Sequence, residues 1–135
     1  MEYRIEEIEG IGSVYAARLR EAGVDTTADL LQRGSARAGR ETLAEITGIS
    51  PALILKWVNH ADLFRIKGVA GQFAELLEAA GVDTVKELRH RVPANLHARL
   101  VEVNGARHLC GRVPAEVEIA RMVQQAADLQ PVVTY

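Results

Sequence analysis

The chain has 135 residues, of which 48% are hydrophobic and 25% are charged, and its formal net charge is −2 at pH 7. This is the length of one domain, and the hydrophobic fraction is enough for a real core. The slightly acidic balance argues against a strong nucleic-acid binder, which would usually show a basic face. No apolar run approaches the ~18 residues of a membrane span, and nothing at the amino terminus resembles a signal peptide, so we expect a cytoplasmic protein.

One stretch of the sequence occurs twice. Residues 8–26 read IEGIGSVYAARLREAGVDT, and residues 66–84, which begin 58 positions later, read IKGVAGQFAELLEAAGVDT. A repeat of this kind indicates a duplicated supersecondary unit.

A shorter pattern, apolar-x-x-apolar-x-Gly-apolar-small, defines the centre of this unit. It occurs at residues 5–12, 43–50 and 63–70, and a degenerate fourth copy at 100–105 loses its end in 106–111. The apolar pair fits the end of one helix, the glycine supplies the positive φ of a tight turn, and the small residue lets a second helix begin close by. The pattern therefore predicts tandem helix-hairpin-helix units.

In the first part of the chain, turns are predicted at Gly10 and Gly48. A helix after Gly10 should stop at Gly23, and Thr26 with Asp29 has the spacing of a capping box that begins the next helix. Pro51 suits the first position of a helix. The apolar stripes of the helices after the two turns are expected to be core: Tyr15, Ala16, Leu19 and Ala22, then Leu53, Ile54, Trp57, Val58 and Ala61.

The second part should repeat this order. A helix continues through 60–63, a turn follows at Gly68, the next helix stops at Gly81, and Thr84 with Glu87 forms a second capping box. Pro114 should begin a last helix, and 130–135 should be an extended tail. The stripe after Gly68 contains Phe73, Ala74, Leu77 and Ala80.

These elements predict an all-α fold with about ten short helices, because no alternation of period two is present. Residues 1–60 should form a first helix-hairpin-helix pair, and residues 61–135 a second pair with a degenerate last hairpin. We expect the two pseudo-equivalent halves to form one compact body, since no Pro, Gly or Ser linker separates them.

Residues 53–69, 81–88 and 95–104 resemble a bacterial and archaeal family of tandem helix-hairpin-helix proteins that has only a domain-of-unknown-function label. More distantly, the hairpins resemble those of DNA ligases, recombinase amino-terminal domains and the carboxy-terminal domain of the RNA polymerase alpha subunit. That resemblance implies contact with the DNA backbone. The chain departs from its family at 105–111, where a more charged stretch is expected, and from DNA-binding hairpins at Ala70, where a second glycine is usual.

A glycine hairpin can hold phosphate because the first N–H groups of its second helix have no carbonyl partner and carry the positive end of the helix dipole. Contacts of this kind carry no base information, so binding to DNA or RNA would be sequence-independent and sensitive to salt. The candidate residues are Gly10, Gly12 and Ser13 in one cradle, and Gly68, Ala70 and Gly71 in another.

Charge favours the second cradle. The first follows Glu2, Glu6, Glu7 and Glu9, whereas the second is flanked by Lys56, Arg65 and Lys67. Two further basic groups are interpreted as solvated helix faces, although the second could extend a phosphate track. They are Arg33, Arg37 and Arg40, then Arg89, His90, Arg91, His97 and Arg99.

Two alternatives stay open. The same turns can simply pack helices, and the chain would then be a protein adaptor whose partner docks on a low-charge surface between the halves or on the Val132–Val133 tail. We expect no enzyme, cofactor or metal site. No nucleophile elbow or phosphate-binding loop is present, and His97, His108 and Cys110 match no closed zinc pattern. A single cysteine fits a reducing compartment.

Overall fold

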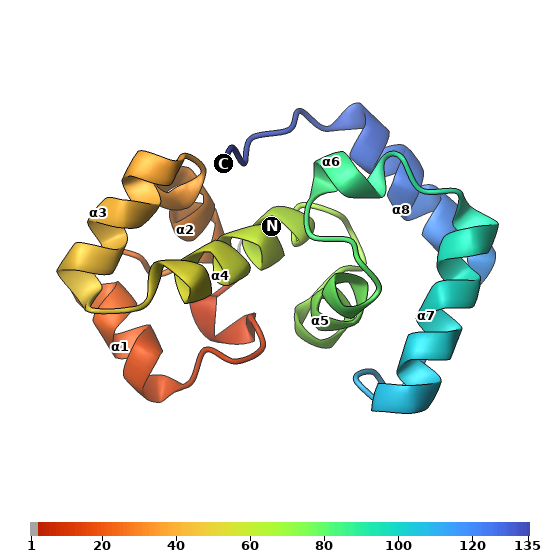
Figure 1. Cartoon of the computed structure of the whole chain (residues 1–135), viewed down its shortest axis with the longest axis horizontal. Helices are drawn as coiled ribbons and strands as arrows, with labels where there is room; N and C mark the ends of the chain where they lie inside the picture. Colours follow the sequence, from red (N-terminus) through yellow and green to blue (C-terminus); the bar gives the residue numbers. More distant parts are fainter. Residues whose placement is uncertain (1–2) are drawn as a thin grey trace. The chain divides into compact units, whose positions relative to one another are not determined.

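The computed structural model describes residues 3–135. Their regular secondary structure is all helical, which confirms the all-α prediction, and their only β-type pairing is an isolated antiparallel bridge between Arg4 and Thr26. The described residues form one 3-10 helix and eight α-helices, compared with about ten helices predicted; Figure 1 labels the α-helices. These elements are η1 (Ile5–Glu7), α1 (Ser13–Glu21), α2 (Thr27–Gly34), α3 (Arg37–Thr47), α4 (Pro51–Leu63), α5 (Gly71–Ala79), α6 (Val85–Leu88), α7 (Pro93–Arg107) and α8 (Glu116–Asp128).

The chain forms two compact units. Unit 1 contains the residues up to Asp62 together with Val132–Tyr135, and unit 2 is Leu63–Pro131. Helix α4 is continuous through residues 60–63, as predicted.

Unit 1 has its core around Trp57 of α4, which is 1% exposed. The rings of Trp57 and Tyr15, the latter from α1, have centroids 5.1 Å apart. Helix α2 comes so close to α4 that a side chain on Gly34 would overlap Val58. The prediction that Trp57 belongs to the core is therefore confirmed, and Tyr15 is half-buried beside it.

Unit 2 is built from α5 to α8. Helix α7 packs against α5 and α8, and α6 packs against α8. Phe73, Ala74 and Leu77 on the predicted stripe of α5 are buried, which confirms that this face belongs to the core.

Glycine conformations follow the sequence pattern at the three complete copies. Gly10, Gly48 and Gly68 have φ of 90°, 71° and 92°, in the region that favours glycine. Gly23 and Gly81, which follow α1 and α5, also have positive φ, of 87° and 94°. These turns are confirmed. At the degenerate fourth copy, Gly105 lies inside α7 instead.

The sequence repeat has a matching local backbone. The Val24 N–H donates to the Leu19 carbonyl at 2.9 Å, and the Val82 N–H donates to the Leu77 carbonyl at 2.8 Å. The first intrahelical bonds of α1 and α5 also correspond, since each is 2.9 Å long and returns to the residue before the helix.

Two local predictions were wrong, and one feature was missed. The capping box of Thr26 and Asp29 is present, but Thr84 makes no side-chain cap hydrogen bond to α6, which has only four residues. Pro114 precedes α8, which begins at Glu116. The first-position proline missed in the sequence is Pro93, at the start of α7.

Candidate nucleic-acid interface

The two glycine turns of the repeat each lead into a helix without a side-chain cap. Gly12 precedes α1 and Ala70 precedes α5, both with extended backbone, and neither helix start has a side-chain cap hydrogen bond. The first N–H groups of an α-helix lack intrahelical partners and concentrate the positive end of its dipole. Both helix starts therefore have the electrostatic character of an anion site.

The turn at Gly48 is different. The Ser50 hydroxyl accepts a hydrogen bond from the Ala52 N–H at 3.2 Å, and Pro51 has no N–H to offer. One N–H of this helix start is therefore already bonded and another is absent, so the turn at Gly48 offers fewer donors than the other two.

The turn at Gly68 opens on a hollow of about 370 Å³ within unit 2. One side of the hollow comes from the turn and the start of α5, and the other from the loop between α7 and α8. Its lining residues are Gly68, Ala70, Gln72, Phe73, Cys110, Gly111 and Arg112. Sequence reasoning missed Gln72 and the loop residues, because the loop follows the turn by about forty residues and no local pattern connects them.

Side chains hold the loop of this hollow in place. Asn104 of α7 donates to the Cys110 carbonyl at 3.0 Å and accepts from the Cys110 N–H at 2.8 Å. Helix α7 ends at Arg107, and the next residue, His108, has φ of 51° and turns the chain into the loop. The loop therefore presents Arg112 from a fixed backbone.

Arg112 and Glu118 form a two-pronged ion pair, with both nitrogen–oxygen distances at 3.1 Å. This hydrogen bonding raises the pKa of Arg112 and lowers that of Glu118, whose carboxylate also accepts from the Ala115 N–H. Arg112 thus adds a cation to the hollow, but the nearby carboxylate offsets part of its field.

Lys67 and Arg65 differ in their roles. The side chain of Lys67 is exposed, while its backbone N–H donates to Gln125 of α8 at 3.0 Å and so anchors the turn. Arg65 is half-buried and donates to the Gln130 carbonyl at 2.8 Å, at the end of α8. Lys67 is therefore the predicted cation that the structure leaves most open to solvent.

The predicted site residues belong to different parts of the chain. Gly68, Ala70 and Gly71 lie with Arg65 and Lys67 in unit 2, whereas Lys56 is half-buried on α4 in unit 1. The first cradle, of Gly10, Gly12 and Ser13, is also in unit 1.

Acidic residues surround the first cradle. Glu6 pairs with Arg20, and hydrogen bonding from that guanidinium lowers the pKa of Glu6. The carboxylate of Glu7 accepts from the Arg4 N–H at 2.9 Å, and Glu9 is exposed next to Gly10. Glu7 and Glu9 thus add acidic side chains before this turn that would oppose a phosphate, whereas Arg20 offsets part of the charge of Glu6.

Several arginines interpreted as solvated have structural partners. Arg33 donates to the Ala22 carbonyl at 2.8 Å and Arg91 donates to the Gly81 carbonyl at 3.0 Å, so these two, 58 positions apart, each brace the end of a repeat helix. Arg89 donates to the Ala127 carbonyl at 2.9 Å. Arg40 is only 5% exposed, which overturns its solvated interpretation.

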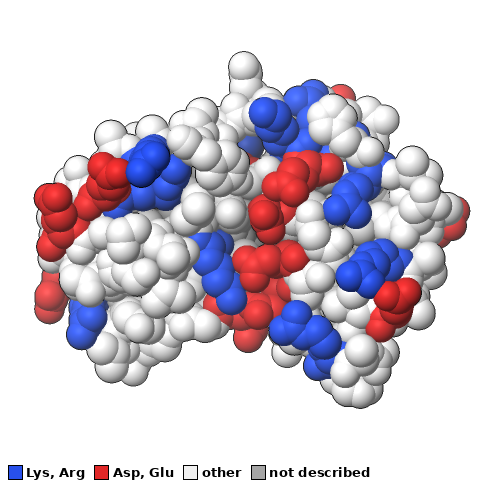
Figure 2. All heavy atoms as spheres, viewed as in Figure 1, with Lys and Arg blue, Asp and Glu red and all other residues white. Residues whose placement is uncertain are grey.

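Figure 2 shows how charge is distributed on one face of the described chain. Lys and Arg side chains lie there in small groups with Asp and Glu groups between them. Any anion site on this face is therefore local rather than part of a broad basic surface.

Two further observations concern the chemistry of the described residues. Within 3–135, no three His, Cys, Asp or Glu side chains gather as a metal site would require, and His97, His108 and Cys110 do not form one. Over the same range, no helix has both the length and the apolar character needed to cross a bilayer.

Fold and site together define an all-α protein whose duplicated glycine turns lead into uncapped helices, one of them beside a hollow that Arg112 lines. The chain belongs to the family described as Domain of unknown function (DUF4332), whose match covers residues 9–129. This confirms the resemblance to an uncharacterised family. Neither the curated proteins nor the solved structures contain a match to the chain.

Proposed function

We propose that this chain is a non-enzymatic helix-hairpin-helix protein that binds the backbone of DNA or RNA weakly and without base recognition. The contact surface is the turn at 67–71 with Arg112. The observation that carries the proposal is the uncapped start of α5, which opens on the hollow that Arg112 lines. A phosphate oxygen there would accept hydrogen bonds from backbone N–H groups at the positive end of the helix dipole.

The charges in unit 2 support weak binding. Lys67 and Arg112 are the two cations of the surface, and Glu118 offsets part of the second. Two neutralised phosphates predict a slope of about −2 for log K against log salt on duplex DNA. A methyl group on Gly68 would lie only 3.1 Å from Met122 of α8, and the Lys67 N–H donates to Gln125 of the same helix. The turn is therefore held against α8 and would not need to be ordered on binding.

The test is fluorescence anisotropy of labelled single- and double-stranded oligonucleotides at low and near-physiological salt. We expect micromolar binding that falls with salt, and we expect Lys67→Glu to weaken it and to reduce the slope by about one. Lys86→Glu is the matched control, because it makes the same charge change at an exposed residue of unit 2 outside the hollow.

Equal losses in the two variants would mean that net charge, and not the turn, controls binding. No binding by the parent chain at low salt would reduce the glycine turns to packing devices. The adaptor hypothesis, with a protein partner, would then replace this proposal.

A further inference from the structure

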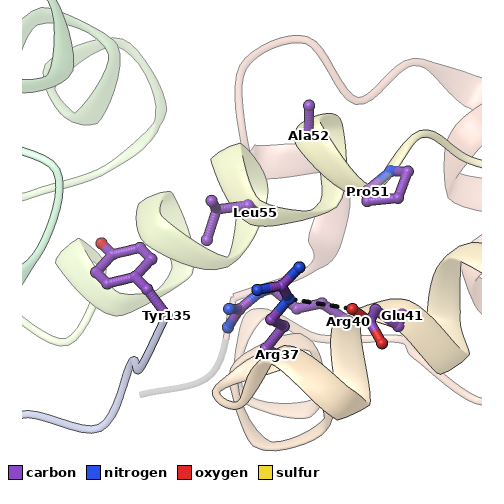
Figure 3. Close-up of a pocket in the computed structure, with 7 residues that line it drawn as sticks. All are labelled: Arg37, Arg40, Glu41, Pro51, Ala52, Leu55 and Tyr135. Atoms are coloured by element: carbon purple, nitrogen blue, oxygen red, sulfur yellow. Dashed lines mark hydrogen bonds and ion pairs between the residues drawn. The ribbon is translucent and has the colours of Figure 1, made fainter.

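A second hollow, of about 420 Å³, lies within unit 1 between α3 and α4 and is unrelated to the proposed nucleic-acid surface. We call it the tail groove. It is lined by Arg37, Arg40 and Glu41 of α3, by Pro51, Ala52 and Leu55 of α4, and by Tyr135. Figure 3 shows the Tyr135 ring beside Leu55 at one end of the α4 side of this groove.

Backbone hydrogen bonds hold the segment Val132–Tyr135 in place. The Thr134 N–H donates to the Ser35 carbonyl at 2.8 Å, and the Thr134 carbonyl accepts from the Arg40 guanidinium at 2.7 Å. Both polar groups of one extended residue are thus satisfied by unit 1, as they would be in a bound peptide.

Arg40 is buried in unit 1 and contacts this segment. Its guanidinium also donates to the Gly34 and Ser35 carbonyls at 2.9 and 3.0 Å, which fixes its position at the junction of α2 and α3. It lies 5.9 Å from the centre of the Tyr135 ring, within the range of a cation–π contact. Two such contacts, to a backbone carbonyl and to a ring, select an extended segment that carries an aromatic residue.

The segment nevertheless covers the tail groove incompletely. Tyr135 is 66% exposed and Val132 is 37% exposed, so little apolar area is buried on binding. The chain before it, from Leu129 to Pro131, follows the end of α8 and has no regular structure. A segment that is weakly buried and follows an irregular connection can leave its own unit and bind the same site of a second copy, as in domain swapping.

We propose that the tail groove is a binding site for an extended peptide segment with an aromatic residue, and that the segment able to replace the chain's own Val132–Tyr135 is the same segment of a second copy. The contacts would be those seen within one chain. Exchange would need high concentration, because the tethered segment has an effective concentration in the millimolar range.

The first experiment uses a full-length variant in which the tail is released. Thr134→Pro removes the N–H group that donates to the Ser35 carbonyl, and Tyr135→Ala removes the aromatic ring. A labelled peptide QPVVTY, with both ends blocked, should bind this double variant at least about tenfold more tightly than it binds the parent chain, whose groove is occupied. Equal affinities, with helicity unchanged by circular dichroism, would overturn the site.

Peptide variants test the contacts without altering the protein. A peptide with Thr134→Pro should lose binding about tenfold or more, because it lacks the donor for Ser35. A peptide with Tyr135→Ala should bind several-fold more weakly, while Tyr135→Phe should bind nearly as well, since a cation–π contact needs the ring and not the hydroxyl. If neither Thr134→Pro nor Tyr135→Ala changed the affinity of the peptide, the contacts with Ser35 and Arg40 would be excluded as the basis of binding.

The second-copy ligand has its own test. The tail-released variant keeps an open groove, and a Leu55→Arg variant keeps an intact tail with an obstructed groove. We expect each to be monomeric alone and the mixture to show a 1:1 complex by sedimentation velocity. Peptide binding without that complex would overturn the second copy as the ligand.

Discussion

The two repeat copies have nearly the same turn and opposite surroundings. Gly10 and Gly68 differ by 2° in φ, from 90° to 92°, and both precede an uncapped helix. Carboxylates flank the first turn, and the second has Lys67 and Arg112. Backbone geometry is therefore set by the glycine and the apolar positions, whereas the charge around each turn is set by side chains that the repeat does not specify.

The two repeat copies also differ in how the helices that follow them pack. In unit 1, α2 and α3 approach through glycine: a side chain on Gly39 would collide with the Arg33 carbonyl oxygen. The residue 58 positions after Gly39 is His97, which is half-buried on α7. The copies thus share a turn but pack their next helices in different ways, and this difference can be tested.

The largest expected effect comes from Gly39→Ala. Alanine would gain up to about 1 kcal/mol from helix propensity, but its methyl group meets backbone that cannot move aside easily. We expect a net loss of about 2–3 kcal/mol in the free energy of unfolding, measured by urea denaturation.

Gly105→Ala is the control for that change. Gly105 lies within α7, and no heavy atom outside its own helix turn lies within 4 Å of the place that an alanine methyl group would take. This substitution should stabilise the protein by up to about 1 kcal/mol. Equal responses at Gly39 and Gly105 would contradict the close approach of α2 and α3.

The next effect concerns the glycines that end α1 and α5. Gly23→Ala and Gly81→Ala should each cost about 1–2 kcal/mol, because φ values of 87° and 94° strain an L-residue. Gly81→Ala should cost more, since its methyl would lie 3.1 Å from the Arg91 guanidinium, compared with 3.5 Å from Arg33 at Gly23. Thermal unfolding of both variants measures the difference, and a smaller loss at Gly81 would contradict this ordering.

These positions also show what the sequence could predict. A positive φ requires glycine, so the turns and the helix ends after α1 and α5 could be found from residue spacing. The pattern at Gly105 was misleading because a glycine is tolerated inside a helix. Helix α7 continues past Gly105 to Arg107, and the left-handed residue that follows it is His108.

The rest depends on contacts between distant residues. The burial of Arg40 requires Thr134, which is 94 residues away, and the hollow at Gly68 requires the loop of Arg112. Periodicity places residues on a helix face but does not say which loop will cover that face. The candidate site could therefore be predicted at the turn and not at the loop.

A smaller effect distinguishes the two threonines that precede α2 and α6. Thr26 accepts from the Asp29 N–H at 3.1 Å, whereas Thr84 makes no cap hydrogen bond. Thr26→Val should cost about 1 kcal/mol through loss of the cap. Thr84→Val keeps the shape of a buried side chain and should change the free energy of unfolding little. Urea denaturation at pH 7 measures both, and equal costs would contradict the assignment of only one cap.

The smallest effect has opposite signs at two equivalent carboxylates, Asp29 and Glu87, which are 58 positions apart. Hydrogen bonds from the backbone N–H groups of Asp25 and Thr26 lower the pKa of Asp29, so its ionised form stabilises the fold above the unfolded pKa, and this contribution is lost as pH falls through the folded pKa. Burial, together with the Asp83 carboxylate, raises the pKa of Glu87, so its ionised form is penalised and stability should decrease as pH rises through that pKa. Asp29→Asn should therefore reduce stability at pH 7 and make it less dependent on pH between 3 and 5, while Glu87→Gln should leave stability at pH 7 unchanged or raised. Urea denaturation from pH 3 to pH 7 measures both changes in stability. Changes of the same sign at pH 7 would show that the two carboxylates have the same effect on the fold.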